Sequence, residues 1–260
     1  MKKKILTVVL AIFLFFGFTG PVHAVSFDQN VIPDVIFGSG NANGSFTVDN
    51  TNGIELGLRG KLRHDTNGFP QNTFNSNGDG TYNFNAGVAP TQPYPTAEWS
   101  FEWSVNSNVD GSGNFLNQFT YLLGIDSDPT VAAAFTTFDP INIATGADHA
   151  IGDNNTGNGG GTSIPNNDPN QDTLYAALIG TNNVAQNSWK PHWFINPFDP
   201  TVDGTYDFFL EAFDANGASL ARTEIQIIVG QGGAPIPEPT TSILFGLGLI
   251  GLAGAVRSKQ

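Results

Sequence analysis

The sequence predicts an all-β protein, built as a single antiparallel β-sandwich or jelly-roll-like domain over residues 25–230. Several short segments alternate apolar and polar residues with period two, and turns rich in Gly, Asn, Asp and Pro separate them. No sustained helical stripe interrupts that range. A domain of about 200 residues can bury a core that is stable without disulfides, and this chain has no cysteine.

Three segments in the first half show the strand pattern. Residues 45–48 and 54–59 alternate on either side of residues 49–53, a predicted hairpin turn in which Gly53 can adopt a positive φ. The third segment places aromatic and apolar side chains on one face and polar side chains on the other, so we expect the polar face to lie in solvent. Its apolar face consists of Trp99, Phe101, Trp103 and Val105.

The second half continues the β pattern. Residues 119–125 and 174–179 are short apolar runs between turn residues, and we interpret both as strands. Residues 206–213 and 220–229 flank an Asp-Ala-Asn-Gly turn at 214–217. This spacing predicts a second hairpin.

Two stretches break the β pattern. Residues 66–80 and 146–172 are rich in Asn and Gly and poor in apolar residues. Because few apolar contacts would offset the entropy of ordering them, we predict long surface loops. Binding sites on a sandwich commonly lie in such loops.

The N-terminus predicts export. Lysines at positions 2–4 precede an apolar run over residues 5–18, and small residues occupy the positions before the bond after Ala24. We predict a helical signal peptide over residues 1–24, removed by signal peptidase. The alternative is an uncleaved anchor, which the shortness of the apolar run disfavours.

The charge of the exported part excludes one class of partner. Residues 25–239 contain five basic residues and all 23 acidic residues, so the formal charge of this part is −18. Such a surface repels phosphate backbones, and we therefore predict that nucleic acid is not a partner.

The C-terminus has the order of a membrane segment. A linker over residues 231–239 ends in Pro-Glu-Pro, and residues 243–256 are all apolar or Gly. A helix over residues 240–256 would be about 25 Å long, slightly less than the ~30 Å of a bilayer core. The basic tail, residues 257–260, would hold its end on the cytoplasmic side. We predict a transmembrane helix that resides in the inner membrane only transiently.

These C-terminal residues resemble a PEP-CTERM sorting signal. The resemblance rests on order, spacing and position, and its sorting residues are Pro237, Glu238, Pro239, Thr240, Arg257 and Lys259. It implies recognition by an exosortase, a membrane-embedded cysteine transpeptidase that removes the helix and releases the body or attaches it to the surface. The tail departs from the commoner pair of arginines, and an ordinary single-span anchor is the alternative. The body resembles secreted β-proteins with such tails, which implies association with an extracellular polysaccharide matrix or biofilm.

Two glutamates are the first candidates for catalysis. Glu98 and Glu102 share a strand face beside two tryptophans, but four residues along a strand span about 13 Å. Retaining glycosidases hold their carboxyls about 5 Å apart, and inverting ones roughly 6.5–9.5 Å. A simple hydrolase would instead need a pair from different strands among Glu55, Glu98, Glu102 and Glu211. We favour carboxylates on a solvated face.

The histidines show no catalytic pattern. His64, His149 and His192 belong to no His-Glu-x-x-His motif, and the chain has no Gly-x-Ser-x-Gly elbow. We therefore expect surface or loop histidines.

Two further pairs of residues have both a ligand-binding interpretation and a simpler structural one. Asp126 and Asp128 end an apolar run and could contribute oxygens to calcium, although the Asp-x-Asp-x-Asn-Gly spacing of a binding loop is absent. Ordinary turn acids are the simpler interpretation. Trp189 and Trp193 would stack on sugars if exposed and would fill one end of the sandwich if buried, and packing is favoured.

The leading hypothesis is a non-enzymatic protein of the cell surface or extracellular matrix, exported and sorted by an exosortase. The sequence requires no cofactor, with calcium as the open alternative. A carbohydrate-binding module that contacts extracellular polysaccharide is the second hypothesis, and a secreted glycoside hydrolase is the third.

Overall fold

The computed structural model of the chain describes residues 24–142, 148–165 and 168–233. Two predicted segments therefore lie outside the described residues: the signal peptide up to residue 23, and the Pro-Glu-Pro motif with the sorting helix and the basic tail.

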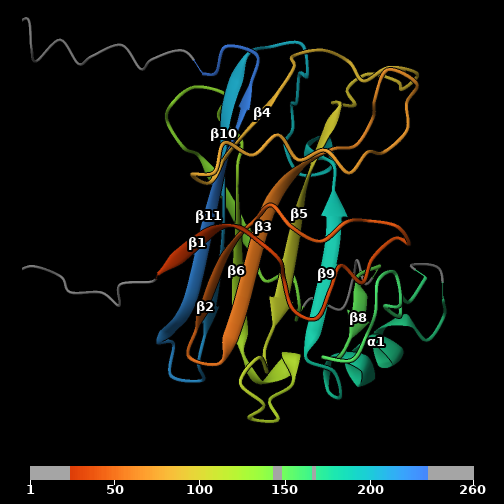
Figure 1. The fold of residues 1–260 in the computed structure, drawn as a ribbon, viewed down its shortest axis with the longest axis vertical. Coiled ribbons are helices and arrows are strands. Elements are labelled where there is room, and N and C mark those ends of the chain that lie inside the picture. The colour runs from red at the N-terminus through yellow and green to blue at the C-terminus, as the bar shows by residue number, and fades with distance from the viewer. Residues whose placement is uncertain (1–23, 143–147, 166–167, 234–260) are drawn as a thin grey trace, which may run out of the picture.

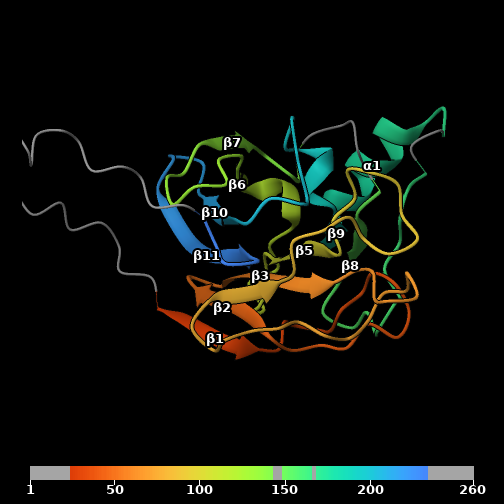
Figure 2. The same cartoon turned by 90° about the horizontal axis from the view of Figure 1, so that it is seen from above.

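Two β-sheets pack face to face (Figure 1, Figure 2), which confirms the predicted sandwich. The first sheet contains, in spatial order, β1 (Val25–Gln29), β2 (Phe46–Thr51), β3 (Ile54–Leu62), β5 (Trp99–Asn106), β9 (Val184–Trp189) and β8 (Ala150–Gly152). The second contains β4 (Thr81–Phe84), β11 (Ser219–Val229), β10 (Gly204–Phe213), β6 (Thr120–Asp126) and β7 (Phe135–Phe138). Neighbouring strands are antiparallel except β4 and β11, which are parallel.

Both predicted hairpins are confirmed, and their turn residues explain why. Strands β2 and β3 meet at Asn52 and Gly53, which both have positive φ, 53° and 77°. A two-residue loop of this kind matches the right-handed twist of the strands. Between β10 and β11, the Asp214 carboxylate accepts hydrogen bonds from the backbone N–H groups of Asn216 and Ala218, both at 2.8 Å.

The inner face of β5 forms the centre of the core. Trp99 and Phe101 both contact Phe208 of the opposite sheet, with ring centroids 6.3 and 4.6 Å apart. Trp103 and Val105 continue the same buried face. The aromatic alternation therefore identified the core side of this strand correctly.

The outer face of β5 is also buried, so the expectation of a solvated polar face is wrong. Residues 30–44 cross this face, and their backbone is bound to polar side chains of the sheet. Gln186 Nε2 donates to the Asp34 carbonyl at 2.8 Å, and Asn106 Nδ2 donates to the Ile32 carbonyl at 3.0 Å. The polar alternation reflects a second, hydrogen-bonded layer that excludes water.

The run 174–179 is helical, so its interpretation as a strand is wrong. It lies in α1 (Gln171–Ile179), where Tyr175 and Ile179 are one turn apart and buried. Ala and Leu favour helix, and a run of six residues is too short for its period to decide. Two short 3₁₀ helices, η1 (Leu116–Gln118) and η2 (Pro191–Trp193), complete the elements.

The two predicted loops are found in large part. Residues 66–80 form no element, although Ser76 makes one bridge to Tyr82. The stretch 146–172 contains β8 and the start of α1, which its composition did not indicate. In the described part of the chain, no helix is long and apolar enough to cross a membrane.

Candidate functional site

One end of the sandwich collects three loops and three of the six exposed aromatic side chains of the described residues. Strand β5 pairs antiparallel with both β3 and β9, so the end of β3, the start of β5 and the end of β9 meet at one sheet end. We call the loops gathered there, residues 63–72, 85–98 and 190–203, the loop end; it is uppermost in Figure 1.

The loops of the loop end are tied to each other. Gly87 N–H donates to the Pro200 carbonyl at 2.6 Å, and Tyr94 Oη donates to the Phe198 carbonyl at 3.5 Å. Gly68 lies so close to Thr91 that a Cβ there would stand 2.0 Å from the threonine hydroxyl. The loop end is therefore one connected surface.

The predicted tryptophan pair is divided between core and surface. Trp189 is 7 % exposed and packs on Phe194 and Trp103, with ring centroids 4.8 and 5.3 Å apart. Trp193, on η2, is 54 % exposed. Trp189 fills the end of the core, and Trp193 is the member of the pair that could contact a ligand.

Two further aromatic residues on this surface were missed by sequence reasoning. Phe69 is 65 % exposed and Tyr94 is 61 % exposed, and together with Trp193 they are the most exposed large hydrophobic side chains among the described residues. Both adjoin prolines, in Gly-Phe-Pro and Pro-Tyr-Pro. An aromatic residue next to proline in a polar loop is a signal that could have found them, because the stiff backbone holds the ring outward.

Basic groups accompany these aromatic residues. Arg63 follows β3, Lys190 follows β9, and both are partly exposed. Burial is the largest cause that lowers the pKa of His64, and the charges of Lys190 and Arg63 lower it further. His192 likewise has a lowered pKa, through burial first and then through Lys190 and His64. Lys190 is therefore within electrostatic reach of Arg63 and of both histidines.

Two of the three histidines, His64 and His149, lie in loops as expected, but both side chains are buried. His64 is buried, and its Nδ1–H donates to the Gly68 carbonyl at 3.2 Å. His149 is buried against the rings of Trp103 and Trp189, 4.9 and 5.5 Å away. Burial lowers the pKa of His149. His149 is buried by rings that lie far away in the sequence, so its local sequence gives no sign of this burial.

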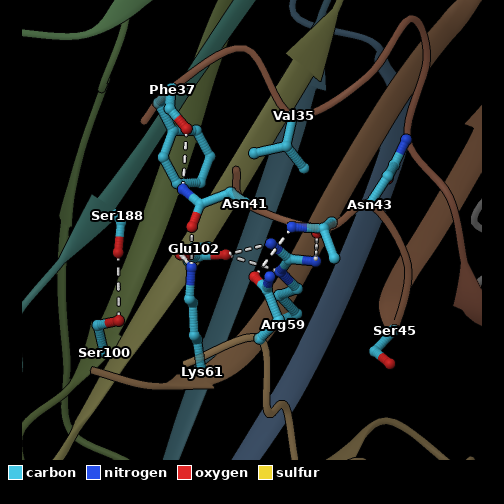
Figure 3. Close-up of polar contacts among 12 residues, drawn as sticks. Val35, Phe37, Asn41, Asn43, Ser45, Arg59, Lys61, Ser100, Glu102 and Ser188 are labelled. Carbon is cyan, nitrogen blue, oxygen red and sulfur yellow. Dashed lines mark hydrogen bonds and ion pairs between the residues drawn. The ribbon is translucent and has the colours of Figure 1, made fainter. Parts of the chain in front are cut away.

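Glu102 is an ion-paired core residue. It is completely buried, Arg59 Nε donates to its Oε2 at 2.7 Å, and Lys61 Nζ lies 3.6 Å from its Oε1 (Figure 3). The Arg59 guanidinium stacks between Phe46 and Phe74, 4.1 and 3.9 Å from their ring centroids. The interpretation of Glu102 as a solvated carboxylate is therefore wrong, and the residue stabilises charge within the protein.

The four glutamates considered for hydrolysis have different partners. Glu55 accepts a hydrogen bond from the Ile32 N–H at 2.7 Å, and burial raises its pKa to about 7. Glu98 accepts from the Asn85 N–H at 2.7 Å. Glu211 lies on the other sheet, paired with Arg222 at 2.8 Å. Glu55 and Glu102 are opposite Asn106 and Arg59 in the ladder, a separation of about 13 Å along the strands.

Asp126 and Asp128 stabilise a turn. Asp126 Oδ1 accepts from the backbone N–H groups of Asp128 and Ala134 at 2.9 and 2.7 Å, and Asp128 Oδ1 accepts from Thr130 N–H at 2.9 Å. Within the described ranges, no three His, Asp or Glu side chains are grouped to hold a metal ion. These contacts support the simpler interpretation as turn acids.

A groove of about 500 Å³ crosses the outer face of the second sheet. Among its lining residues are Phe27, Phe135, Phe209, Arg222 and Glu224. Arg222 lies 4.1 Å over the Phe209 ring and is held by Glu211 at 2.8 Å. Because Glu211 already neutralises Arg222, the groove offers an anionic ligand less positive charge than the loop end does.

Comparison with known proteins identifies the C-terminal segment. Residues 235–258 match the PEP-CTERM protein-sorting motif, which contains the six predicted sorting residues except Lys259. This motif indicates an exported protein that is sorted at the membrane, and it implies processing by an exosortase. No curated protein and no solved structure matches the chain. The resemblance of the body to other secreted β-proteins therefore stays a prediction.

Proposed function

We propose that this protein is a non-enzymatic structural or adhesive component of the cell surface or extracellular matrix. The observation that carries the proposal is the PEP-CTERM sorting motif at residues 235–258. The body supports it, because the carboxylates Glu55, Glu98, Glu102 and Glu211 each serve a separate internal contact.

The proposed route has three steps. Signal peptidase cleaves after Ala24, residues 240–256 hold the chain briefly in the inner membrane, and exosortase removes that helix. The body, left on the surface or in the matrix, then carries a formal charge near −18. This charge keeps it soluble and separate from nucleic acid.

The test removes the motif and follows the chain. Deletion of residues 235–260, and a triple substitution of Pro237, Glu238 and Pro239 by Ala, should abolish the sorting cleavage. Intact mass and cellular fraction of the recovered protein report both cleavages. Gln231→Ala, just before the motif, is the matched control and should be processed normally. Unchanged processing of the triple variant, or native protein that retains residues 240–256, would overturn the proposal.

A second candidate function is carbohydrate binding at the loop end. The specific observation is the exposure of Phe69, Tyr94 and Trp193 on one connected surface, since flat aromatic rings stack on the apolar faces of sugars. In a polysaccharide pull-down, Trp193→Ala and Tyr94→Ala should reduce retention. Phe135→Ala, which removes an exposed ring elsewhere, should not. Equal losses in all three variants would exclude this surface.

A further inference from the structure

We propose that the loop end binds an acidic polysaccharide, with Arg63 and Lys190 pairing with sugar carboxylates while Trp193 stacks on a sugar ring. The inference rests on the carbohydrate-binding candidate above and specifies its ligand as a pyranose chain that carries carboxylate groups.

The first argument is the distribution of positive charge. The exported part has only five basic residues against 23 acidic ones. Arg59 and Lys61 are buried with Glu102, and Arg222 pairs with Glu211 and Glu224. Among the residues that the structure describes, the remaining two, Arg63 and Lys190, have no carboxylate within ion-pair distance. They are the cations available to an anionic ligand.

The second argument is that these two cations lie within electrostatic reach of each other. Lys190 has a lowered pKa, through partial burial first and then through the charge of Arg63. The charged groups that shift the pKa of His64 are Lys190 and Arg63, and those that shift the pKa of His192 are Lys190 and His64. Like charges in proximity repel, and an anion placed between them relieves that repulsion.

The carboxylates of the same loops are engaged elsewhere. Asp65 accepts from the Asn67 and Phe69 N–H groups at 2.8 and 2.9 Å, so it shapes its own turn. Asp199 accepts from Thr201, and Glu98 accepts from Asn85. These three carboxylates are satisfied within their own loops, and the fourth, Asp203, lies against Gly230. Among the described residues, none of the four forms an ion pair with Arg63 or Lys190.

The third argument is the combination of a cation and a ring. Lys190 Nζ lies 5.9 Å from the centroid of the exposed Trp193 ring. A pyranose stacked on that indole would place a carboxylate on its ring within reach of the ammonium group. The neighbouring loops supply Tyr94 and Phe69 for adjoining sugars. Since the rest of the body is strongly acidic, contact with a polyanion is confined to this end.

The test uses one polymer in two charge states. The full-length protein is titrated with polygalacturonate and with the same polymer after reduction of its carboxyl groups, at about 0.1 M salt, where charges beyond about 10 Å are screened. The variants are Arg63→Gln with Lys190→Gln, Trp193→Ala, and Lys190→Arg, which keeps the charge. Arg222→Gln is the control, because it removes an equal charge that is already paired.

We expect the acidic polymer to bind at least about tenfold more tightly than the reduced polymer, and the double variant to lose that difference. Trp193→Ala should weaken both polymers, whereas Lys190→Arg and Arg222→Gln should bind normally. Equal binding of the two polymers by the native protein leaves carbohydrate binding intact and overturns the acidic ligand. If the native protein binds neither polymer, both carbohydrate binding at the loop end and the acidic ligand are overturned. Equally tight binding of single-stranded DNA would also overturn the inference, because it would show general attraction for polyanions.

Discussion

Glu102 shares one buried site with two cations, Arg59 and Lys61. All three side chains are at most 1 % exposed. The Arg59 guanidinium also donates to the carbonyls of Ala42 and Gly44, at 3.0 and 2.6 Å. Removing charges from water is costly, and here the cost is offset only while the carboxylate stays ionised between its partners.

Glu102→Gln should therefore destabilise the protein by about 3–5 kcal/mol, because two buried cations would lose their counter-charge. Urea denaturation measures the change in the free energy of unfolding. The matched control is Glu224→Gln, whose side chain is 71 % exposed although it pairs with Arg222; it should change stability by less than about 1 kcal/mol. A loss below about 1 kcal/mol for Glu102→Gln would contradict this account.

Glu55 predicts a dependence of stability on pH. Burial raises its pKa from 4.5 to about 7, against the opposing hydrogen bond from Ile32. The folded protein then binds the proton more tightly than the unfolded chain. The contribution of Glu55 to the free energy of unfolding is greatest below pH 4.5 and is lost as the pH rises through 7.

The effect of Glu55→Gln on stability follows from the raised pKa of Glu55. The neutral amide can still accept from Ile32 N–H, so the variant should exceed the native protein in stability at pH 8, by about 2–3 kcal/mol at most. Near pH 4.5 the two should be nearly equal. Urea midpoints at the two pH values check this. A difference that is the same at both would show that ionisation of Glu55 is not the cause.

At the scale of elements, strand β6 is fitted to β10 at a single glycine. Gly124 pairs with Phe209, whose ring covers it. A Cβ on Gly124 would stand 2.0 Å from a ring carbon, and that ring is packed by Arg222 and Phe135. The aromatic ring takes the space that a side chain on β6 would need.

Gly124→Ala should accordingly cost about 1–3 kcal/mol, since the Phe209 ring must move against its neighbours. Gly157→Ala is the control, because no atom lies within 4 Å of a Cβ there. Thermal unfolding of both variants measures the effect. Equal melting temperatures would mean that the β6–β10 contact relaxes without strain.

The elements also show how far sequence reasoning extends. Both hairpins were predictable because the turn residues Asn52, Gly53 and Asp214 fix local backbone geometry. The buried outer face of β5 was not, because residues 30–44 that cover it come from far away in the sequence. The same limit applies to the site. Trp193 was a candidate because of its aromatic cluster in the sequence. Its place at the same end of the sheet as Arg63 depends on the pairing of β3, β5 and β9, which local sequence does not show.

For the whole molecule, the dominant electrostatic quantity is the charge of −18 over residues 25–239. Self-repulsion of that size opposes the compact state, and salt screens it. We expect the urea midpoint to rise between about 10 mM and 200 mM NaCl. At matched ionic strength, CaCl2 and MgCl2 should raise the urea midpoint by the same amount. A gain specific to calcium would restore the calcium alternative at Asp126.

The last described strand ends where the loop end begins. Val229 pairs with Gly204, which directly follows residues 190–203, and Gly230 N–H donates to the Phe84 carbonyl at 2.9 Å. The sorting motif starts five residues further along the chain. Under the proposed route, we therefore expect a molecule that is still attached through that motif to hold the loop end and its Trp193 close to the membrane, and we expect removal of the sorting helix to make that surface accessible to a ligand.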